Sequence, residues 1–370
     1  MSRERDVWCL FGLPFDSLSL RDACGEVVAA VEEKRQTVLS VTNINWVVLA
    51  CRDAAFCNNI AMSDFNFIDG MTLFWCARFL GLPIPERIAG PTLLENLSKI
   101  KKTPRMRVYF FGGAEGIAEE ACKKINATEL SGAGFCNPGF GNSEEMSREK
   151  YLQDINMSSA DILVLSNGAK KGMAWIQANK HKLRVFLIAY LGQAVNLIAG
   201  KIKRAPEWIQ KIGAEWIWRI YQEPALWGRY FFDGVSFLNF FFFRLIPLKT
   251  LIFLNKKNEE NKQPPAMEIV DEGEKNTLFI KGVCNRHSRS AVRRFFLETV
   301  GRGKDLELNL ENLDYAESSF FGNLWILWKA QNANGRELNI RISTIRTQRL
   351  FYFYGMEKFL RTDAMGEETC

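Results

Sequence analysis

Short apolar runs alternate with amphipathic segments along the first two hundred residues of the chain. A short apolar run favours a buried β-strand, whereas apolar residues spaced three or four positions apart favour a helix. Their alternation predicts an α/β protein built on a Rossmann-like open sheet. We expect strands at 6–11, 37–42, 65–68, 107–111, 160–165 and 185–191, and helices at 20–33, 71–80 and 171–179, with others that begin at 46 or end at 125.

Two segments that follow the predicted sheet differ from it in composition. Residues 199–230 carry six basic side chains against three acidic ones and repeat aromatic residues at helical spacing, which favours a helical appendage at a membrane surface. For about half of these aromatic residues, a helix packed on the core is the alternative. Residues 231–254 are almost wholly apolar, interrupted by Asp233 and two basic residues. Because Pro247 is expected to break a helix, we interpret 231–254 as a membrane-interface segment. A single bilayer span is the alternative.

The pattern changes again after a polar, proline-bearing linker at 255–266. Residues 267–370 are expected to form a separate small α/β domain that folds alone. Strands are predicted at 277–280, 306–310 and 338–342, and helices at 318–333 and 344–353.

The stretch N-L-E-N-L-D-Y-A-E-S-S-F-F-G-N-L resembles a STAS domain of the anti-sigma-factor antagonist type. In regulatory members a serine at the turn into the helix is phosphorylated, and Ser318 holds the matching position. The resemblance therefore implies a regulatory serine and a protein partner for this domain. A serine that only caps the helix is the alternative.

Bulk composition narrows the class of protein. The 370 residues are 47% apolar and 24% charged with a net charge of +6, which describes a globular protein long enough for two domains. Nine scattered cysteines without a C-x-x-C pair favour reduced thiols in the cytoplasm. With only two histidines, a multi-histidine metal site or a histidine-based triad is not expected. The first residues lack an apolar signal region.

A carboxylate and a guanidinium follow the predicted strand 65–68. Asp69 precedes a glycine at the strand end, and the carboxyl ends of strands in an open sheet form the edge where ligands bind. Arg87 comes shortly after two prolines that can hold it rigidly near the same rim. An ordinary turn with a surface arginine is the alternative.

Further candidates lie at other predicted strand ends and in the appendage. Polar side chains before a helix N-terminus can bind a sugar or phosphate, although Asn45 could simply cap its helix. Glycine-rich turns let backbone N–H groups approach a diphosphate, and a guanidinium binds phosphate oxygens in a fixed fork. The substrate-binding candidates are Thr42, Asn45, Gly112, Gly113, Gly168, Lys171, Arg204 and Arg219.

The order of these motifs resembles the WecG/TagA/CpsF glycosyltransferases. I-D-G at 68–70, an apolar helix and P-x-P-E-R-I-A-G at 83–90 follow the family's order within a match from about 41 to 243. The resemblance implies inverting transfer from a nucleotide-diphosphate sugar, a UDP-sugar of N-acetylmannosamine type or a related one. The implied acceptor is linked to a polyprenyl diphosphate, in polysaccharide synthesis on the inner face of the cell membrane.

The resemblance also implies roles for single residues. Asp69 would take the proton of the acceptor hydroxyl, and Arg87, Arg204 and Arg219 would stabilise the leaving diphosphate. The chain has no D-x-D motif, so we expect no obligatory divalent metal, and no cofactor. No nucleic-acid motif accompanies the basic residues, which lie beside an apolar segment. The sequence is compatible with a monomer or a homo-oligomer.

The chain departs from the family at the helix 171–179. The usual G-x-P-x-Q-E is replaced by G-A-K-K-G-M, so Gly172 and Met173 stand in place of an amide and a carboxylate, and Asn196 stands where aspartate is common. Lys171 or its neighbour could supply a cation to the donor instead. The alternative function is a weak or inactive transferase-fold scaffold whose STAS-like domain binds a regulatory protein. Restoring glutamine and glutamate at these two positions would distinguish an active transferase from such a scaffold.

Overall fold

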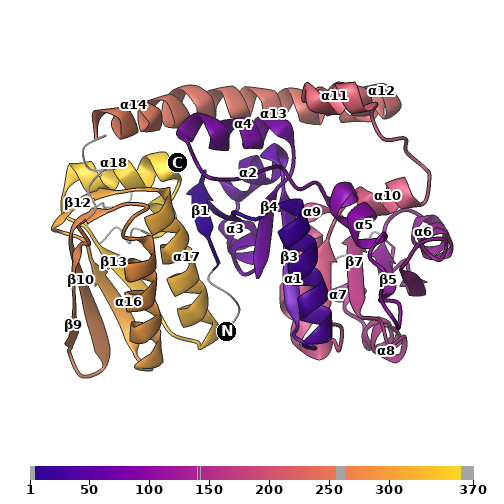
Figure 1. The fold of residues 1–370 in the computed structure, drawn as a ribbon, viewed down its shortest axis with the longest axis horizontal. Coiled ribbons are helices and arrows are strands. Elements are labelled where there is room, and N and C mark those ends of the chain that lie inside the picture. The colour runs from indigo at the N-terminus through magenta and orange to yellow at the C-terminus, as the bar shows by residue number, and fades with distance from the viewer. Residues whose placement is uncertain (1–4, 140, 142, 256–262, 360–370) are drawn as a thin grey trace. The chain divides into compact units, whose positions relative to one another are not determined.

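A computed structural model describes residues 5–139, 141, 143–255 and 263–359 (Figure 1). The chain divides into two compact units. The larger unit comprises Asp16–Arg78 and Pro83–Phe237, and the smaller unit comprises Met1–Phe15, Phe79–Leu82 and Leu238–Cys370. The predicted linker 255–266 lies mostly outside the described residues.

The larger unit is built on a parallel six-stranded sheet with the order β4-β3-β8-β7-β5-β6. Every strand points the same way, so their carboxyl ends meet at one edge. This arrangement confirms the predicted Rossmann-like open sheet. The strands are β3 (Thr37–Thr42), β4 (Phe65–Ile68), β5 (Arg107–Gly112), β6 (Ser131–Cys136), β7 (Ile162–Ser166) and β8 (Leu187–Tyr190).

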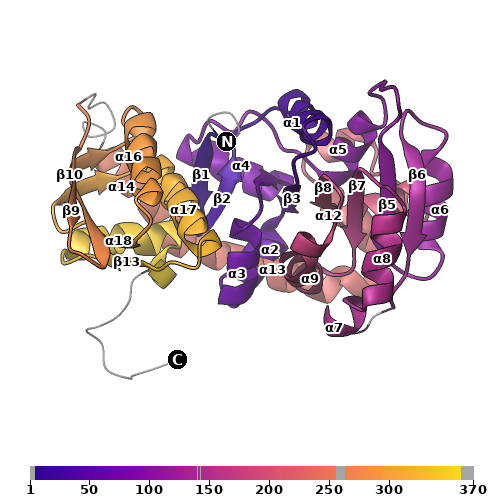
Figure 2. The ribbon, with the colours of Figure 1, turned by 90° about the horizontal axis from the view of Figure 1, so that it is seen from below.

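Helices cover both faces of this sheet, with α1 and α5 on one face and α9 on the other (Figure 2). Alternate strand residues, among them Val108 and Phe110, pack with α1, α5, α6 and α10 in one apolar core. On the opposite face, Trp175 of α9 stacks on Phe111 with ring centroids 4.7 Å apart. The helices are α1 (Leu20–Glu32), α2 (Ile44–Ala50), α3 (Ala54–Ala61), α4 (Met71–Leu80), α5 (Gly90–Leu97), α6 (Ile117–Ile125), α7 (Ser143–Met146), α8 (Glu149–Met157), α9 (Ala169–Asn179), η1 (Lys180–Lys182) and α10 (Ala194–Ile198).

The edge strand β6 is not among the strands predicted from the sequence. A Cβ added at Gly134 would lie 2.8 Å from the ring of Tyr109. Glycine is therefore required there because β6 and β5 approach closely, and the glycine content does not indicate a loop. The strand pairs with β5 through a register shift between Val108 and Tyr109.

The appendage and the apolar segment are helical. They comprise α11 (Glu207–Lys211), α12 (Glu215–Gln222), η2 (Pro224–Leu226), α13 (Trp227–Phe240), η3 (Phe241–Leu245) and α14 (Ile246–Leu254). The expectation that Pro247 breaks a helix is wrong, because helical structure continues from Pro224 to Leu254. The π-helical turn η3 directly precedes α14 and accommodates the missing N–H of the proline within the helix.

The smaller unit contains a second sheet with the order β12-β10-β11-β13, and β9 also pairs with β10. Its elements are β1 (Val7–Leu10), β2 (Leu13–Asp16, of which Asp16 belongs to the larger unit), β9 (Ala266–Asp271), β10 (Lys275–Cys284), α16 (Arg289–Gly301), β11 (Asp305–Asn309), β12 (Leu313–Ala316), α17 (Ser318–Ala333), β13 (Leu338–Arg341), α18 (Ile345–Tyr354) and η4 (Glu357–Phe359).

The N-terminal strand β1 packs against α17 of this smaller unit. A Cβ at Gly322 would lie 2.1 Å from the carbonyl oxygen of Val7, so only glycine lets the strand approach the helix this closely. Arg289 Nη1 also donates to Asp6 Oδ1 at 2.6 Å. Residues 1–15 therefore group with the C-terminal part of the chain, which differs from the predicted boundaries at 1–230 and 267–370.

Candidate active site

A cavity of about 750 Å³ lies within the larger unit. The turns that follow β3, β4, β5, β7 and β8 contribute residues to its wall, as do several residues between Lys201 and Asp233. The cavity therefore opens at the carboxyl edge of the parallel sheet, where open α/β folds bind ligands. Its volume is in the range of small-molecule sites.

Asp69 lies at this edge directly after β4. Its backbone N–H donates to the carbonyl oxygen of Thr42 at 2.8 Å, which ties the two strand ends together. The side chain is half-buried and lines the cavity. Burial raises the pKa of the Asp69 carboxyl to about 6, although the positive charge of Arg87 opposes this shift. A carboxyl with such a pKa is ionised at neutral pH and can accept a proton.

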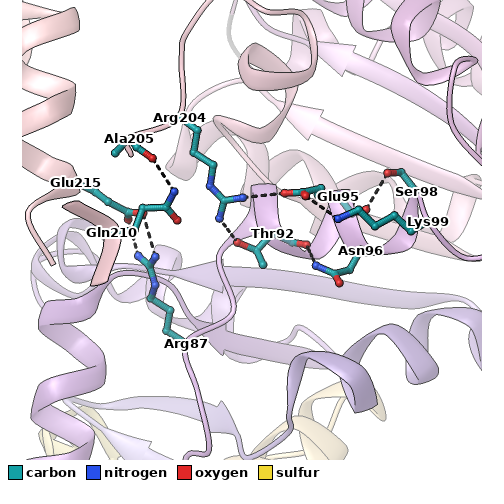
Figure 3. A network of polar contacts seen from close by, with 10 residues as sticks. All are labelled: Arg87, Thr92, Glu95, Asn96, Ser98, Lys99, Arg204, Ala205, Gln210 and Glu215. Atoms are coloured by element: carbon teal, nitrogen blue, oxygen red, sulfur yellow. Dashed lines mark hydrogen bonds and ion pairs between the residues drawn. The ribbon is translucent and has the colours of Figure 1, made fainter. Parts of the chain in front are cut away.

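Arg87 is held beside Asp69 but does not line the cavity. The N–H of Ile88 donates to the carbonyl oxygen of Ile68 at 2.9 Å, which places the arginine near the end of β4. Its guanidinium forms a two-pronged ion pair with Glu215 of α12, at 2.5 and 3.0 Å (Figure 3). Arg87 therefore fastens the appendage to the sheet edge and sets the charge near Asp69.

The two appendage arginines differ in their surroundings. Arg204 donates to Glu95 Oε2 at 2.8 Å and to Thr92 Oγ1 at 2.6 Å (Figure 3). Both arginines line the cavity. In contrast to Arg204, Arg219 has a buried Nη2 without a hydrogen-bond partner among the described residues. Arg219 therefore has a buried donor that an anionic ligand could use.

The glycines at or just after the ends of β5 and β7 differ in whether they line the cavity. Gly113 and Gly168 line the cavity, whereas Gly112 does not. A Cβ at Gly112 would lie 2.9 Å from Cβ of Asn167, and its φ is +91°, so this glycine serves the close packing of two turns. Lys171 lines the wall, and its Nζ donates to the carbonyl oxygen of Gly141 at 3.1 Å.

The end of β3 is arranged differently from what its sequence suggested. Thr42 is buried and donates its hydroxyl to Asn66 Oδ1 at 2.7 Å, so it does not line the cavity. Asn43, not Asn45, caps α2, since its Oδ1 accepts from the N–H of Trp46. The Asn45 side chain therefore does not cap the helix. It lines the cavity, where its Nδ2 donates to Asp233 Oδ1 at 2.9 Å.

The departures at the start of α9 have a steric cause. A Cβ added at Gly172 would lie 2.4 Å from the ring of Tyr190, which occupies that space. Met173 is fully buried. Lys170 forms an ion pair with Asp53 at 2.8 Å and does not line the cavity. Of these residues, only Tyr190 lies on the cavity wall.

Sequence reasoning missed Tyr190, Glu215 and Asp233 as cavity residues. The signal for Asp233 was a lone acid in an apolar run, which was counted only as an interruption. Among the described residues, no group of three or more histidine, cysteine, aspartate or glutamate side chains is placed to hold a metal ion. Ser318 belongs to the smaller unit, where it is buried and donates its hydroxyl to the Cys9 carbonyl oxygen at 2.8 Å.

Known proteins resemble this chain over about half of its length. Three relatives are named N-acetylglucosaminyldiphosphoundecaprenol N-acetyl-beta-D-mannosaminyltransferase. The protein from Bacillus spizizenii is 24% identical over 170 residues, covering 46% of this chain and 65% of the relative. The one from Bacillus subtilis strain 168 is 21% identical, covering 54% and 77%, and the one from Staphylococcus aureus strain MW2 is 20% identical, covering 60% and 86%.

The match to a family model covers both the sheet and the appendage. The model described as the glycosyl transferase WecG/TagA/CpsF family matches residues 8–250. That range includes Asp69, the two arginine pairs of Figure 3 and the helices that close the cavity. The resemblance inferred from the motifs is thereby confirmed, and the chain belongs to the WecG/TagA/CpsF glycosyltransferase family.

Proposed function

We propose that this chain transfers a sugar from a UDP-sugar of N-acetylmannosamine type to an acceptor linked to a polyprenyl diphosphate. The names of the relatives support an N-acetylglucosaminyl-diphospholipid as that acceptor. The observation that carries the proposal is the pairing of Asp69, a half-buried carboxylate, with Arg219, a cation with an unused donor, in one cavity.

These two groups suit the two ends of a single displacement. The carboxylate of Asp69 takes the proton of the acceptor hydroxyl as its oxygen bonds to the anomeric carbon of the donor. The bond between that carbon and the donor diphosphate breaks on the opposite face, which inverts the configuration. The diphosphate leaves with the electron pair, and Arg219 with the N–H groups near Gly113 stabilises its charge.

Transfer by the purified full-length chain in detergent tests this proposal. The substrates are labelled UDP-N-acetylmannosamine and a synthetic N-acetylglucosaminyl-diphospholipid, with related UDP-sugars as competitors. A labelled disaccharide lipid that requires both substrates supports the proposal. If the chain releases no UDP and binds no UDP-sugar, the alternative of an inactive scaffold holds.

We infer that the helices of the appendage lie on the cytoplasmic face of the membrane. By length and composition, the helix Pro224–Leu254 could cross a bilayer. Two contacts favour the interface instead, since Asp233 binds Asn45 and Arg244 forms an ion pair with Glu357 at 2.5 Å. A spanning helix would have to leave these partners in the hydrocarbon.

The outer side of this helix carries the apolar surface that would enter the lipid. Phe231 is 63% exposed and Trp227 is 60% exposed. Burying one phenylalanine contributes about 1.5–3 kcal/mol, so Phe231→Ser should weaken sedimentation with anionic vesicles by about tenfold or more. Equal sedimentation of both forms would contradict the inference, and association that resists carbonate would favour a span.

The similarity of the smaller unit to a STAS domain remains a prediction. Its helix α17 begins at Ser318, as the pattern indicated. The serine hydroxyl is in use and the residue is buried under the N-terminal strand, so phosphorylation or partner binding at this point requires that strand to move. A regulatory role for Ser318 is thus coupled to the N-terminus of the same chain.

A further inference from the structure

Asp233 is an unusual residue for the helix α13. Its neighbours Phe231, Phe232 and Val235 are exposed by 63%, 45% and 52%, whereas Asp233 is only 3% exposed. It lines the same cavity as Asp69. An ionisable group almost fully removed from water in a mostly apolar helix is costly, so a partner for its charge is expected.

Among the described residues, only one of the two carboxylate oxygens of Asp233 has a hydrogen-bond partner. Oδ1 accepts a hydrogen bond from Asn45 Nδ2 at 2.9 Å. Oδ2 is buried and has no hydrogen-bond partner among the described residues. Burial raises the pKa of the Asp233 carboxyl, while the hydrogen bond from Asn45 and the charge of Arg229 oppose that shift. One acceptor oxygen on the cavity wall is therefore left for a ligand.

The chemistry of this oxygen limits what it can bind. A carboxylate accepts hydrogen bonds from hydroxyl or amide N–H groups and repels phosphate oxygens. The complementary ligand is therefore a saccharide and not the diphosphate. Since exposed apolar side chains occupy the outer side of the same helix, the Asp233 wall lies next to the surface through which a lipid-linked substrate would arrive.

We propose that Asp233, oriented by Asn45, determines specificity by accepting a hydrogen bond from a hydroxyl or amide N–H of the lipid-linked acceptor saccharide. This proposal rests on the proposed function, because it assumes that the cavity takes such an acceptor. It assigns different tasks to Asp69 and Asp233, two of the acidic residues that line the cavity. Asp69 takes the proton, and Asp233 selects and orients the sugar that supplies it.

The test compares Asp233→Asn with the wild type in full-length protein. Asparagine keeps the shape and can still accept from Asn45, but it presents an N–H₂ group where the ligand needs an acceptor. We expect the acceptor KM to rise by about ten- to a hundredfold, the cost of a hydrogen bond to a charged group. The donor KM should stay within about twofold. Glu207→Gln removes one negative charge from an exposed appendage position outside the cavity wall and is the control.

Deoxy and N-deacetylated acceptor analogues identify the bonded group. The analogue that lacks it should lose the same factor with the wild type and lose nothing more with Asp233→Asn. A rise in donor KM instead, or a lower melting temperature with both KM values unchanged, would overturn the proposal. If the wild type shows no transfer, the proposed function fails by itself. Calorimetric binding of the acceptor analogue then decides, and equal affinity for both forms refutes the role of Asp233.

Discussion

Replacing Asp69 with asparagine should separate what this residue does for catalysis from what it costs the fold. Burial raises the pKa of the Asp69 carboxyl from 3.8 to about 6. A shift of this size corresponds to about 3 kcal/mol in favour of the protonated form. The folded chain therefore carries a charged group at neutral pH that it would hold more easily uncharged.

The sign of the pH effect follows from this shift. Because the pKa is higher in the folded chain, Asp69 contributes its stability below pH 3.8 and loses it as the pH rises through about 6. Asparagine is neutral at every pH and escapes that loss. The free energy of unfolding of Asp69→Asn should exceed that of the wild type by up to about 3 kcal/mol at pH 8, and by about half as much at pH 5.

Urea unfolding at the two pH values measures this difference, with the exposed Glu115→Gln as a control expected to stay within about 0.5 kcal/mol of the wild type. Turnover at saturating donor should fall about a hundredfold or more in Asp69→Asn, as expected for the loss of a general base. A variant that is inactive but not more stable at pH 8 would refute the burial argument. Unchanged turnover would remove Asp69 from the mechanism.

Three further variants test the remaining parts of the cavity. Glu215→Gln removes a negative charge that raises the pKa of Asp69, so the acid limb of the kcat/KM profile, expected near pH 6 in the wild type, should move to lower pH. Arg219→Met should raise the donor KM by about ten- to a hundredfold, which initial rates at increasing UDP-sugar concentration would measure. Gly172→Ala should lower the free energy of unfolding by about 1–3 kcal/mol because of the Tyr190 ring, although alanine normally favours a helix. A stabilised Gly172→Ala chain would show that the ring moves aside easily.

Most strands of the larger unit, and half of its helices from α1 to α10, could be predicted, because each depends on a local pattern. The strands 37–42 and 65–68 and the helix 71–80 occur at the predicted residues. The strand β6 was missed because its glycines resemble a loop, and their cause is a ring on the neighbouring strand. A local pattern does not contain such a contact.

The turns that form the candidate site could be predicted from the sequence, but the roles of the single residues in it could not. Strand ends can be read from a sequence, and the topology then brings them together. Which arginine has a buried donor without a partner depends on residues far away in the chain, since Arg204 binds Glu95 and Arg87 binds Glu215. The grouping of residues 1–15 with the C-terminal unit has the same origin, a contact between segments some three hundred residues apart.

The substitution of Gly172 and Met173 for the family's polar pair bears on activity less directly than the sequence suggested. The ring of Tyr190 fills the space that a side chain at 172 would need, and Met173 is fully buried. Restoring glutamine and glutamate would therefore create a clash and a buried charge, so a loss of activity in that variant would say nothing about the donor site. The polar group on this part of the wall now comes from Tyr190 at the end of β8, which lines the cavity beside Lys171. Because the Tyr190 ring fills the space beside Gly172 and lines the cavity, donor specificity is better tested at position 190 than at position 172.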